Sequence, residues 1–191
     1  MDGIGGCLRN KEYPILTDYP IFIDLLNNSI IQQKMKAAPA KEIKTALSEL
    51  SQPDLMVLCL RLARFKKENK ELLTYLLFEA DDEESYIESV KGEIDYELEQ
   101  VNRKNYFFIK KGIRKVLRMI KKYIRYSGNK ETEVILLLYF CQRLRAFQPS
   151  INRSRILKNM YLQQEKVIRT AIGKLHEDLQ YDYLQELKND D

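Results

Sequence analysis

The 191-residue sequence predicts an all-α fold, in which antiparallel helical hairpins pack as a bundle or a short α-α superhelix of about six or seven helices. Three observations predict it. The chain holds only seven Gly and five Pro, apolar residues recur at spacings of three and four from Pro39 onward, and no segment shows the period-two alternation of a strand. With 45% apolar and 31% charged residues, the composition is that of a folded chain.

The first 35 residues differ from the rest of the chain. Three glycines and two prolines interrupt helical periodicity there, and only "IFIDLLNNSIIQ" at 21–32 suits a helix. We therefore predict a poorly ordered arm with one short helix at 1–35 and a single all-helical domain at 36–188. Met35 opens a segment typical of a protein start, and a start there is a hypothesis that intact-mass measurement would test.

Three helices are predicted before residue 81. Pro39 suits the first turn of a helix that ends near Leu50. Ser51, followed three residues later by Asp54, resembles a capping box and opens a second helix that reaches Phe65. A third helix at 67–80 has closely spaced leucines, and we expect it to lie deep in the core. Those leucines are Leu72, Leu73, Leu76 and Leu77.

The fourth predicted helix, at 83–101, has one narrow apolar stripe. Its apolar residues step by three, four, four and three, so they fall within an arc of about 80° and indicate the seam of a helical hairpin. The stripe consists of Ile87, Val90, Ile94, Leu98 and Val101.

Three more helices are predicted after it. The fifth, at 106–126, should end at Gly128 as its cap, and Asn129 should cap the sixth. The body of the sixth, "VILLLYFCQRL", is apolar on most sides, which favours a central position. After a break around Pro149, we expect one unbroken helix at 155–187.

The segment "NYFFIKKGIRKVLRMIKKYIRY" at 105–126 contains eight bases and no acid. On a helical wheel the bases occupy one face, and their mutual repulsion is on the order of 1–2.5 kcal/mol. The preceding segment 79–99 holds ten acids and one base, so antiparallel pairing should neutralise one flank of this face. Arg118 and Arg125 should point away from that partner. The eight bases are Lys110, Lys111, Arg114, Lys115, Arg118, Lys121, Lys122 and Arg125.

We predict a non-enzymatic helical interaction module that binds a protein partner through this face. The predicted contact residues are Lys111, Arg114, Lys115, Arg118, Lys122 and Arg125, extended by Arg143, Arg145, Arg153 and Arg155. The alternative is binding of RNA or DNA phosphates through the same face, with Tyr106, Phe107 and Tyr126 stacking on bases. Docking on a membrane surface, a merely solvated outer face and a homo-oligomer are also open.

The sequence contains no recognised motif for catalysis, a cofactor or a metal. His176 is the one histidine, which disfavours catalytic triads and most zinc sites; a histidine bonded to a nearby tyrosine is the simpler interpretation. The acidic run "EADDEES" at 79–85 lacks the glycine of a calcium loop. We expect no catalytic residue, no cofactor and no metal.

The sequence favours a cytoplasmic location. Three scattered cysteines, Cys7, Cys59 and Cys141, predict reduced thiols rather than a disulfide framework. The longest apolar run, at 134–141, is far below the ~20 residues that a membrane span needs. We expect neither a membrane span nor an export signal.

Three stretches carry a family resemblance: "LCLRLARFKKENKELLTYLLFEADDEESYIESVK", "KKYIRYSGNKETEVILLLYF" and "LHEDLQYDY". With them the chain resembles an uncharacterised family of small bacterial all-helical proteins with no assigned function, over residues 41–187. The resemblance implies a soluble bacterial cytoplasmic protein. It implies no activity and no binding residues.

Overall fold

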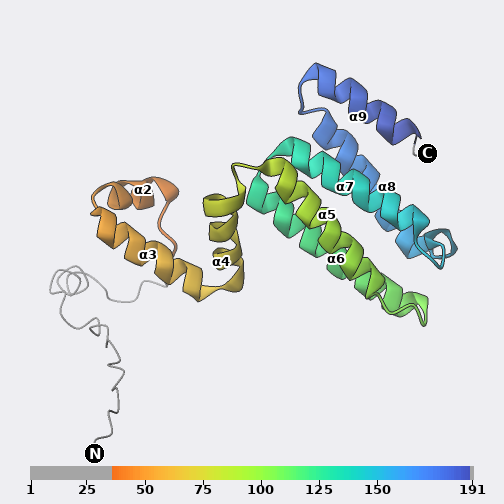
Figure 1. Ribbon diagram of the computed structural model, residues 1–191, viewed down its shortest axis with the longest axis horizontal. Helices are drawn as coiled ribbons and strands as arrows, with labels where there is room; N and C mark the ends of the chain where they lie inside the picture. The colour runs from red at the N-terminus through yellow and green to blue at the C-terminus, as the bar shows by residue number, and fades with distance from the viewer. Residues whose placement is uncertain (1–35, 190–191) are drawn as a thin grey trace, which may run out of the picture. The chain divides into compact units, whose positions relative to one another are not determined.

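The computed structural model describes residues 36–189. Over that range the chain is all-α, with eight α-helices, one π-helical turn and one 3₁₀ turn, and it contains no strand (Figure 1). The predicted fold class is confirmed. The predicted arm at 1–35, with its short helix, lies outside the described residues.

The chain divides into two compact units between Leu55 and Met56. Helix α2, Ala40–Ser48, belongs to the first unit, and Pro39 is its N-cap residue, one position before the first turn in which the sequence placed it. Helix α3, Gln52–Phe65, runs across the division. The single domain expected at 36–188 stays a prediction.

Half of the capping box predicted for α3 is present at its first turn. Ser51 Oγ accepts a hydrogen bond from the Asp54 backbone N–H at 3.4 Å and donates one to Asp54 Oδ2 at 2.5 Å. The Ser51 hydroxyl thus satisfies one backbone N–H of the helix end, whereas the Asp54 carboxylate bonds to that hydroxyl.

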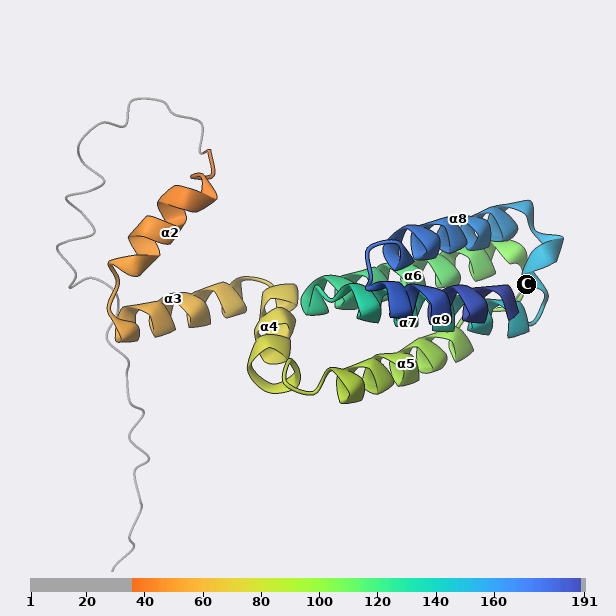
Figure 2. The ribbon, with the colours of Figure 1, turned by 90° about the horizontal axis from the view of Figure 1, so that it is seen from above.

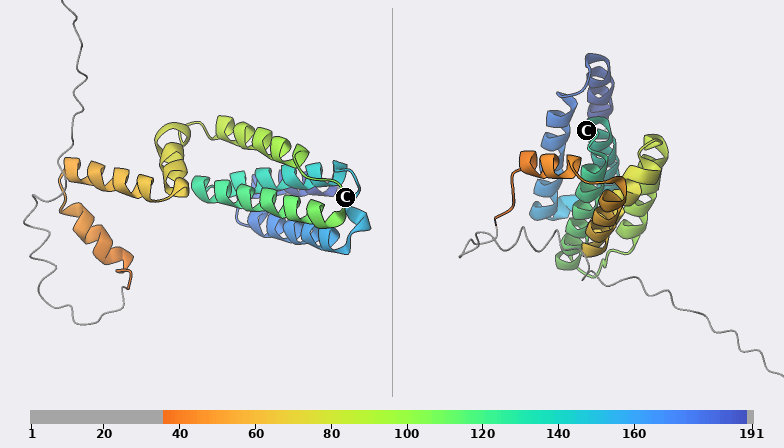
Figure 3. Two further views of the ribbon diagram at one scale, coloured as in Figure 1. Left: turned by 90° about the horizontal axis from the view of Figure 1, so that it is seen from below. Right: turned by 90° about the vertical axis from the view of Figure 1, so that its left-hand side faces the viewer.

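Four helices of the second unit form an antiparallel bundle: α5 (Glu83–Glu99), α6 (Tyr106–Ser127), α7 (Lys130–Ala146) and α8 (Arg155–Ile172). They lie alongside one another, and successive helices run in opposite directions (Figures 1 and 3). Helix α7 packs against α5, α6 and α8, so the predicted central position of the "VILLLYFCQRL" helix is confirmed. Its buried residues are Thr132, Val134, Leu136, Leu137, Leu138, Phe140, Cys141 and Leu144.

The apolar stripe predicted for α5 is the seam that faces this bundle. All five of its members are buried, and Ile94 is completely inaccessible. The helix begins where Asp82 accepts a hydrogen bond from the Ser85 backbone N–H at 3.0 Å. The short turns of this chain make successive helices pack side by side along their length. An apolar stripe with a period of 3.5 to 3.6 residues is then buried along the whole helix.

The predicted single helix at 155–187 is wrong, because the chain breaks between α8 and α9 (Glu177–Asn189). Gly173 ends α8, and backbone N–H groups of the next two residues bond back to Ala171 and Ile172. The break turns α9 onto the bundle (Figure 2), where Leu187 is buried and Tyr183 Oη donates to Glu131 of α7 at 2.9 Å. This break accounts for the eighth helix.

The expectation that 67–80 lies deep in the core is also wrong. The segment forms α4 (Lys67–Thr74) and a π-helical turn (Tyr75–Glu79), in which the Ala80 N–H bonds to the Tyr75 carbonyl at 2.9 Å. The turn contacts α5 and α6. Tyr75 takes the buried position, so Leu76 and Leu77 face away and are 56% and 61% exposed.

Candidate binding surface on helix α6

Both ends of helix α6 are set by capping residues. The Asn105 side chain accepts a hydrogen bond from the Phe108 backbone N–H at 3.1 Å, which caps the first turn. At the other end Gly128 adopts φ 68°, a left-handed conformation that other residues rarely adopt. Between them stand 22 helical residues, or about 33 Å of helix.

One face of α6 is part of the bundle core. Ile109, Ile113 and Ile120 are completely inaccessible, and Val116 and Leu117 are buried beside them. The apolar half of the predicted wheel is therefore confirmed. Because this face is fixed against α5 and α7, the orientation of the basic residues on the opposite side is also fixed.

Five basic side chains form a row along the outer side of α6, which we call the outer basic stripe. All five are exposed, and within residues 36–189 no carboxylate lies within ion-pair distance of any of them. A shallow recess lies on the same side, lined by α6 residues alone, including Phe107 and Leu117. The stripe consists of Lys111, Arg114, Arg118, Lys121 and Arg125.

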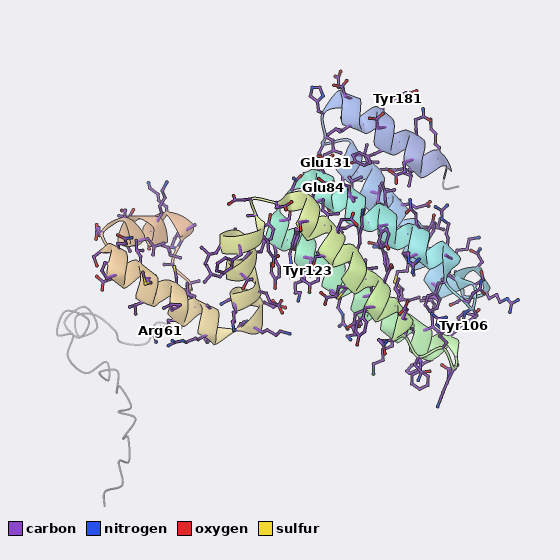
Figure 4. All side chains as sticks on the ribbon, in the orientation of Figure 1. Arg61, Glu84, Tyr106, Tyr123, Glu131 and Tyr181 are labelled. Carbon is purple, nitrogen blue, oxygen red and sulfur yellow. The ribbon has the colours of Figure 1, made fainter. Side chains whose placement is uncertain are left out.

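The flank of α6 that faces α5 is neutralised from within the molecule, as the charge pattern predicted. Lys115 Nζ lies 2.7 Å from Glu97 Oε2 of α5. Further along, Tyr123 Oη donates to Glu93 Oε2 at 2.8 Å, and Tyr86 Oη donates to the Tyr123 carbonyl at 3.0 Å (Figure 4). The acidic helix α5 therefore pairs with one side of the basic face and leaves the outer side open.

Lys122 has an intramolecular partner that the sequence did not predict. Its Nζ lies 2.6 Å from Glu71 Oε2 of α4, and Tyr126 Oη donates to the same oxygen at 2.9 Å. Burial by itself raises the pKa of Glu71, but the hydrogen bonds from Lys122 and Tyr126 outweigh it and lower the pKa below its ordinary value. Lys122 also lies 4.6 Å from the centroid of the Tyr123 ring.

The six predicted contact residues thus separate into two groups. Lys111, Arg114, Arg118 and Arg125 lie together in the outer basic stripe. Lys115 and Lys122 bond to acids of their own chain. Lys121 belongs to the stripe but was absent from the predicted set, although its place between Arg118 and Arg125 in the row would have identified it.

Two of the three aromatic side chains considered for base stacking are engaged elsewhere. Tyr106, half-buried, donates to the Ser150 carbonyl at 3.0 Å (Figure 4), and Tyr126 is buried against Glu71. Phe107 alone of the three is exposed, at 62%, with the Lys110 ammonium 5.4 Å from its ring centroid. A stacking platform of three rings is therefore not available on this face.

The arginines predicted to extend the surface have different surroundings. Arg143 Nε lies 2.6 Å from Asp95 Oδ1, and Arg145 stands 6.0 Å from the Tyr161 ring centroid. Arg153, in the 3₁₀ turn before α8, and Arg155, the first residue of α8, are exposed. Arg143 and Arg145 therefore serve contacts between helices of the bundle.

Metal ligands and membrane spans were sought over the same residues. His176 is 76% exposed in the turn before α9, with Nδ1 3.3 Å from Asp178 Oδ2 rather than beside the expected tyrosine. Residues 36–189 contain no cluster of three or more His, Cys, Asp or Glu side chains that would hold a metal. None of the described helices has the length and apolarity to cross a membrane.

Comparison of the chain with known proteins returned no matching protein family, no matching curated protein and no matching solved structure.

Proposed function

We propose that the protein is a non-enzymatic interaction module that binds an acidic segment of another protein along the outer basic stripe of α6. The observation that carries this proposal is the division of the basic face: one flank is bonded to Glu97 and Glu71, whereas the stripe has no carboxylate partner among residues 36–189. The unrelieved repulsion within the stripe favours an external acid.

The spacing of the stripe supports an acidic protein segment as the ligand. Its residues stand three, four, three and four apart, so they form one row of about 21 Å along the helix. A helical segment with acids at the same spacing would present a matching row. Phe107, exposed in the adjacent recess, would offer apolar contact beside the ion pairs.

RNA or DNA phosphate is the competing ligand for the same surface. A row of lysines and arginines suits a phosphate backbone equally well. The engagement of Tyr106 and Tyr126 within the fold supports the protein ligand instead, because stacking contributes much of the affinity for single strands. We propose the cytoplasm as the location, in keeping with Cys59 and Cys141, which form no disulfide.

Affinity capture from extracts of the native host tests the proposal. Three baits are compared: the unmutated chain, an Arg114→Glu/Arg118→Glu/Arg125→Glu variant, and a Lys70→Glu/Lys158→Glu/Lys188→Glu control that changes the net charge equally. Lys122 is left intact, because a glutamate at this position would place a second carboxylate beside Glu71 and could unfold the protein. Each capture is repeated after nuclease treatment.

We expect a protein that the unmutated and control baits retain, that the stripe variant loses, and that survives nuclease. Binding of labelled mixed-sequence RNA or DNA at low salt, with a steep fall as salt rises, would instead identify the competing ligand. Equal capture by all three baits would show that the stripe is solvated surface and would overturn the proposal.

A further inference from the structure

Helix α4 places an acid of the same chain on the basic face of α6. Glu71 Oε2 accepts hydrogen bonds from Lys122 Nζ at 2.6 Å and from Tyr126 Oη at 2.9 Å, and Lys67 Nζ lies 3.4 Å from Glu71 Oε1. These bonds keep the pKa of Glu71 below its ordinary value, so the carboxylate is charged at neutral pH. Over residues 36–189, the pair of Glu71 and Lys122 is the only ion pair between α4 and α6.

Lys122 stands at the edge of the outer basic stripe. It follows Arg118 by four residues and precedes Arg125 by three, so all three share one side of the helix. Bound to Glu71, the Lys122 side chain is only 19% exposed and does not take part in the row. Without that bond it would complete a series of bases spaced three, four, four and three apart. The series is Lys111, Arg114, Arg118, Lys122 and Arg125.

Helix α4 is held less firmly than the four helices of the bundle. It has no buried residue, whereas each of α5 to α8 buries five or more. It runs across the end of α6 rather than alongside it (Figures 2 and 3), so it cannot pack along its length. Leu72, half-buried, is its apolar contact with the core. A helix with so few buried contacts opens at a low free energy.

The π-helical turn, and not α4, anchors this segment in the bundle. Tyr75, the first residue of the turn, is 5% exposed, and its Oη donates to Glu83 of α5 at 2.7 Å. Glu71 stands one helical turn before Tyr75. Release of Glu71 therefore requires α4 to move while Tyr75 and the bundle stay in place. A π-helical turn often accompanies a functional site in a helical protein.

We propose that α4 is an autoinhibitory strap, in which Glu71 occupies Lys122 until the acidic segment of a partner displaces it. The inference rests on the proposed function, because it needs an acidic ligand on the outer basic stripe. Displacement completes the row of bases for the partner. Since the released state then binds the acidic ligand more tightly, the bound ligand must in turn favour release of α4.

Fluorescence anisotropy at low salt, with a fluorescein-labelled oligoglutamate peptide as the probe, tests the strap. We expect Glu71→Gln to bind the probe about fivefold or more tightly than the unmutated chain. Glu84→Gln is the control, because it removes the same charge from an exposed carboxylate that forms no ion pair within residues 36–189. A further Lys122→Met change should abolish the gain of Glu71→Gln. Circular dichroism checks that each variant is folded.

Hydrogen exchange tests displacement in the unmutated chain. With saturating oligoglutamate, the amides of α4 should exchange faster by about the same factor that Glu71→Gln adds to the affinity, because the coupling is reciprocal. A contact that serves stability alone would leave exchange in α4 unchanged when the probe binds.

The outcomes separate the strap from the proposed function. If the Arg114→Glu/Arg118→Glu/Arg125→Glu variant binds oligoglutamate as the unmutated chain does, or if neither binds it, the proposed function fails and the strap fails with it. Binding that depends on the stripe, with the same affinity in Glu71→Gln as in the unmutated chain, overturns the strap alone. So does a gain that persists without Lys122, or unchanged exchange in α4.

Discussion

Tyr75 Oη donates a hydrogen bond to Glu83 Oε2 at 2.7 Å, and this contact ties the π-helical turn to the first residue of α5. The other oxygen of Glu83 accepts hydrogen bonds from Ser127 at the end of α6 and from Thr132 of α7. Thr132 is completely inaccessible to solvent. One carboxylate therefore joins four elements at this end of the bundle.

Glu83→Ala should lower the free energy of unfolding by about 2–4 kcal/mol, because three donors lose a charged acceptor and Thr132 is left buried without it. Glu84→Ala is the matched control, since Glu84 is an exposed neighbour in the same first turn of α5. Urea denaturation at pH 7 measures both variants. Equal losses would show that Glu83 acts only through the helix dipole.

The contribution of Glu83 should disappear in acid. Burial raises its pKa, but the hydrogen bonds from Ser127, Thr132 and Tyr75 outweigh burial, so the pKa lies below its ordinary value of 4.5. A lowered folded-state pKa means that the stabilisation is complete above pH 4.5 and is lost as pH falls through the folded pKa. The difference in unfolding free energy between the unmutated chain and Glu83→Ala should therefore narrow between pH 7 and pH 3. A constant difference would contradict the charged role.

Lys122→Met should destabilise the protein, whereas Lys121→Met should change its stability by less than about 0.5 kcal/mol. The two lysines are neighbours on α6, but only Lys122 bonds to Glu71. We expect a loss of about 1–2 kcal/mol for Lys122→Met by thermal or urea denaturation. NMR titration should also show the pKa of Glu71 rising in Lys122→Met, because hydrogen bonds from Lys122 and Tyr126 hold it down against burial. An unchanged pKa would assign that effect to Tyr126 and Lys67.

Gly112→Ala should destabilise α6 although alanine is the better helix former. A Cβ atom at this position would lie 2.8 Å from both methyl carbons of Val101, so Val101, in the turn after α5, would have to shift, at about 1–3 kcal/mol. Gly92→Ala is the control, because nothing lies within 4 Å of a Cβ there, and it should stabilise α5 by about 0.5–1 kcal/mol. Denaturation curves distinguish the two. Val101→Ala should relieve part of the Gly112→Ala loss, and a purely additive double variant would argue against the steric cause.

Features that depend on local chemistry were predictable from the amino-acid sequence alone. Asn105, Gly128 and Asn129 mark helix boundaries because capping involves only the neighbouring backbone. The seam of α5 and the two faces of α6 follow from helical periodicity. The same reasoning predicted that α5 would neutralise one flank of the basic face, and the bond between Lys115 and Glu97 confirms it.

The tertiary structure decided which apolar and charged residues have partners. Leu76 and Leu77 are as apolar as buried leucines elsewhere, but the π-helical turn gives the core position to Tyr75. Glu71 reaches Lys122 across 51 residues of sequence, a contact that periodicity within one helix does not encode. Periodicity shows which face of a helix is apolar or basic, because it depends only on the spacing of residues along one helix. Only packing determines what lies against that face. Packing therefore decides which bases of α6 and which apolar residues of α3 remain exposed.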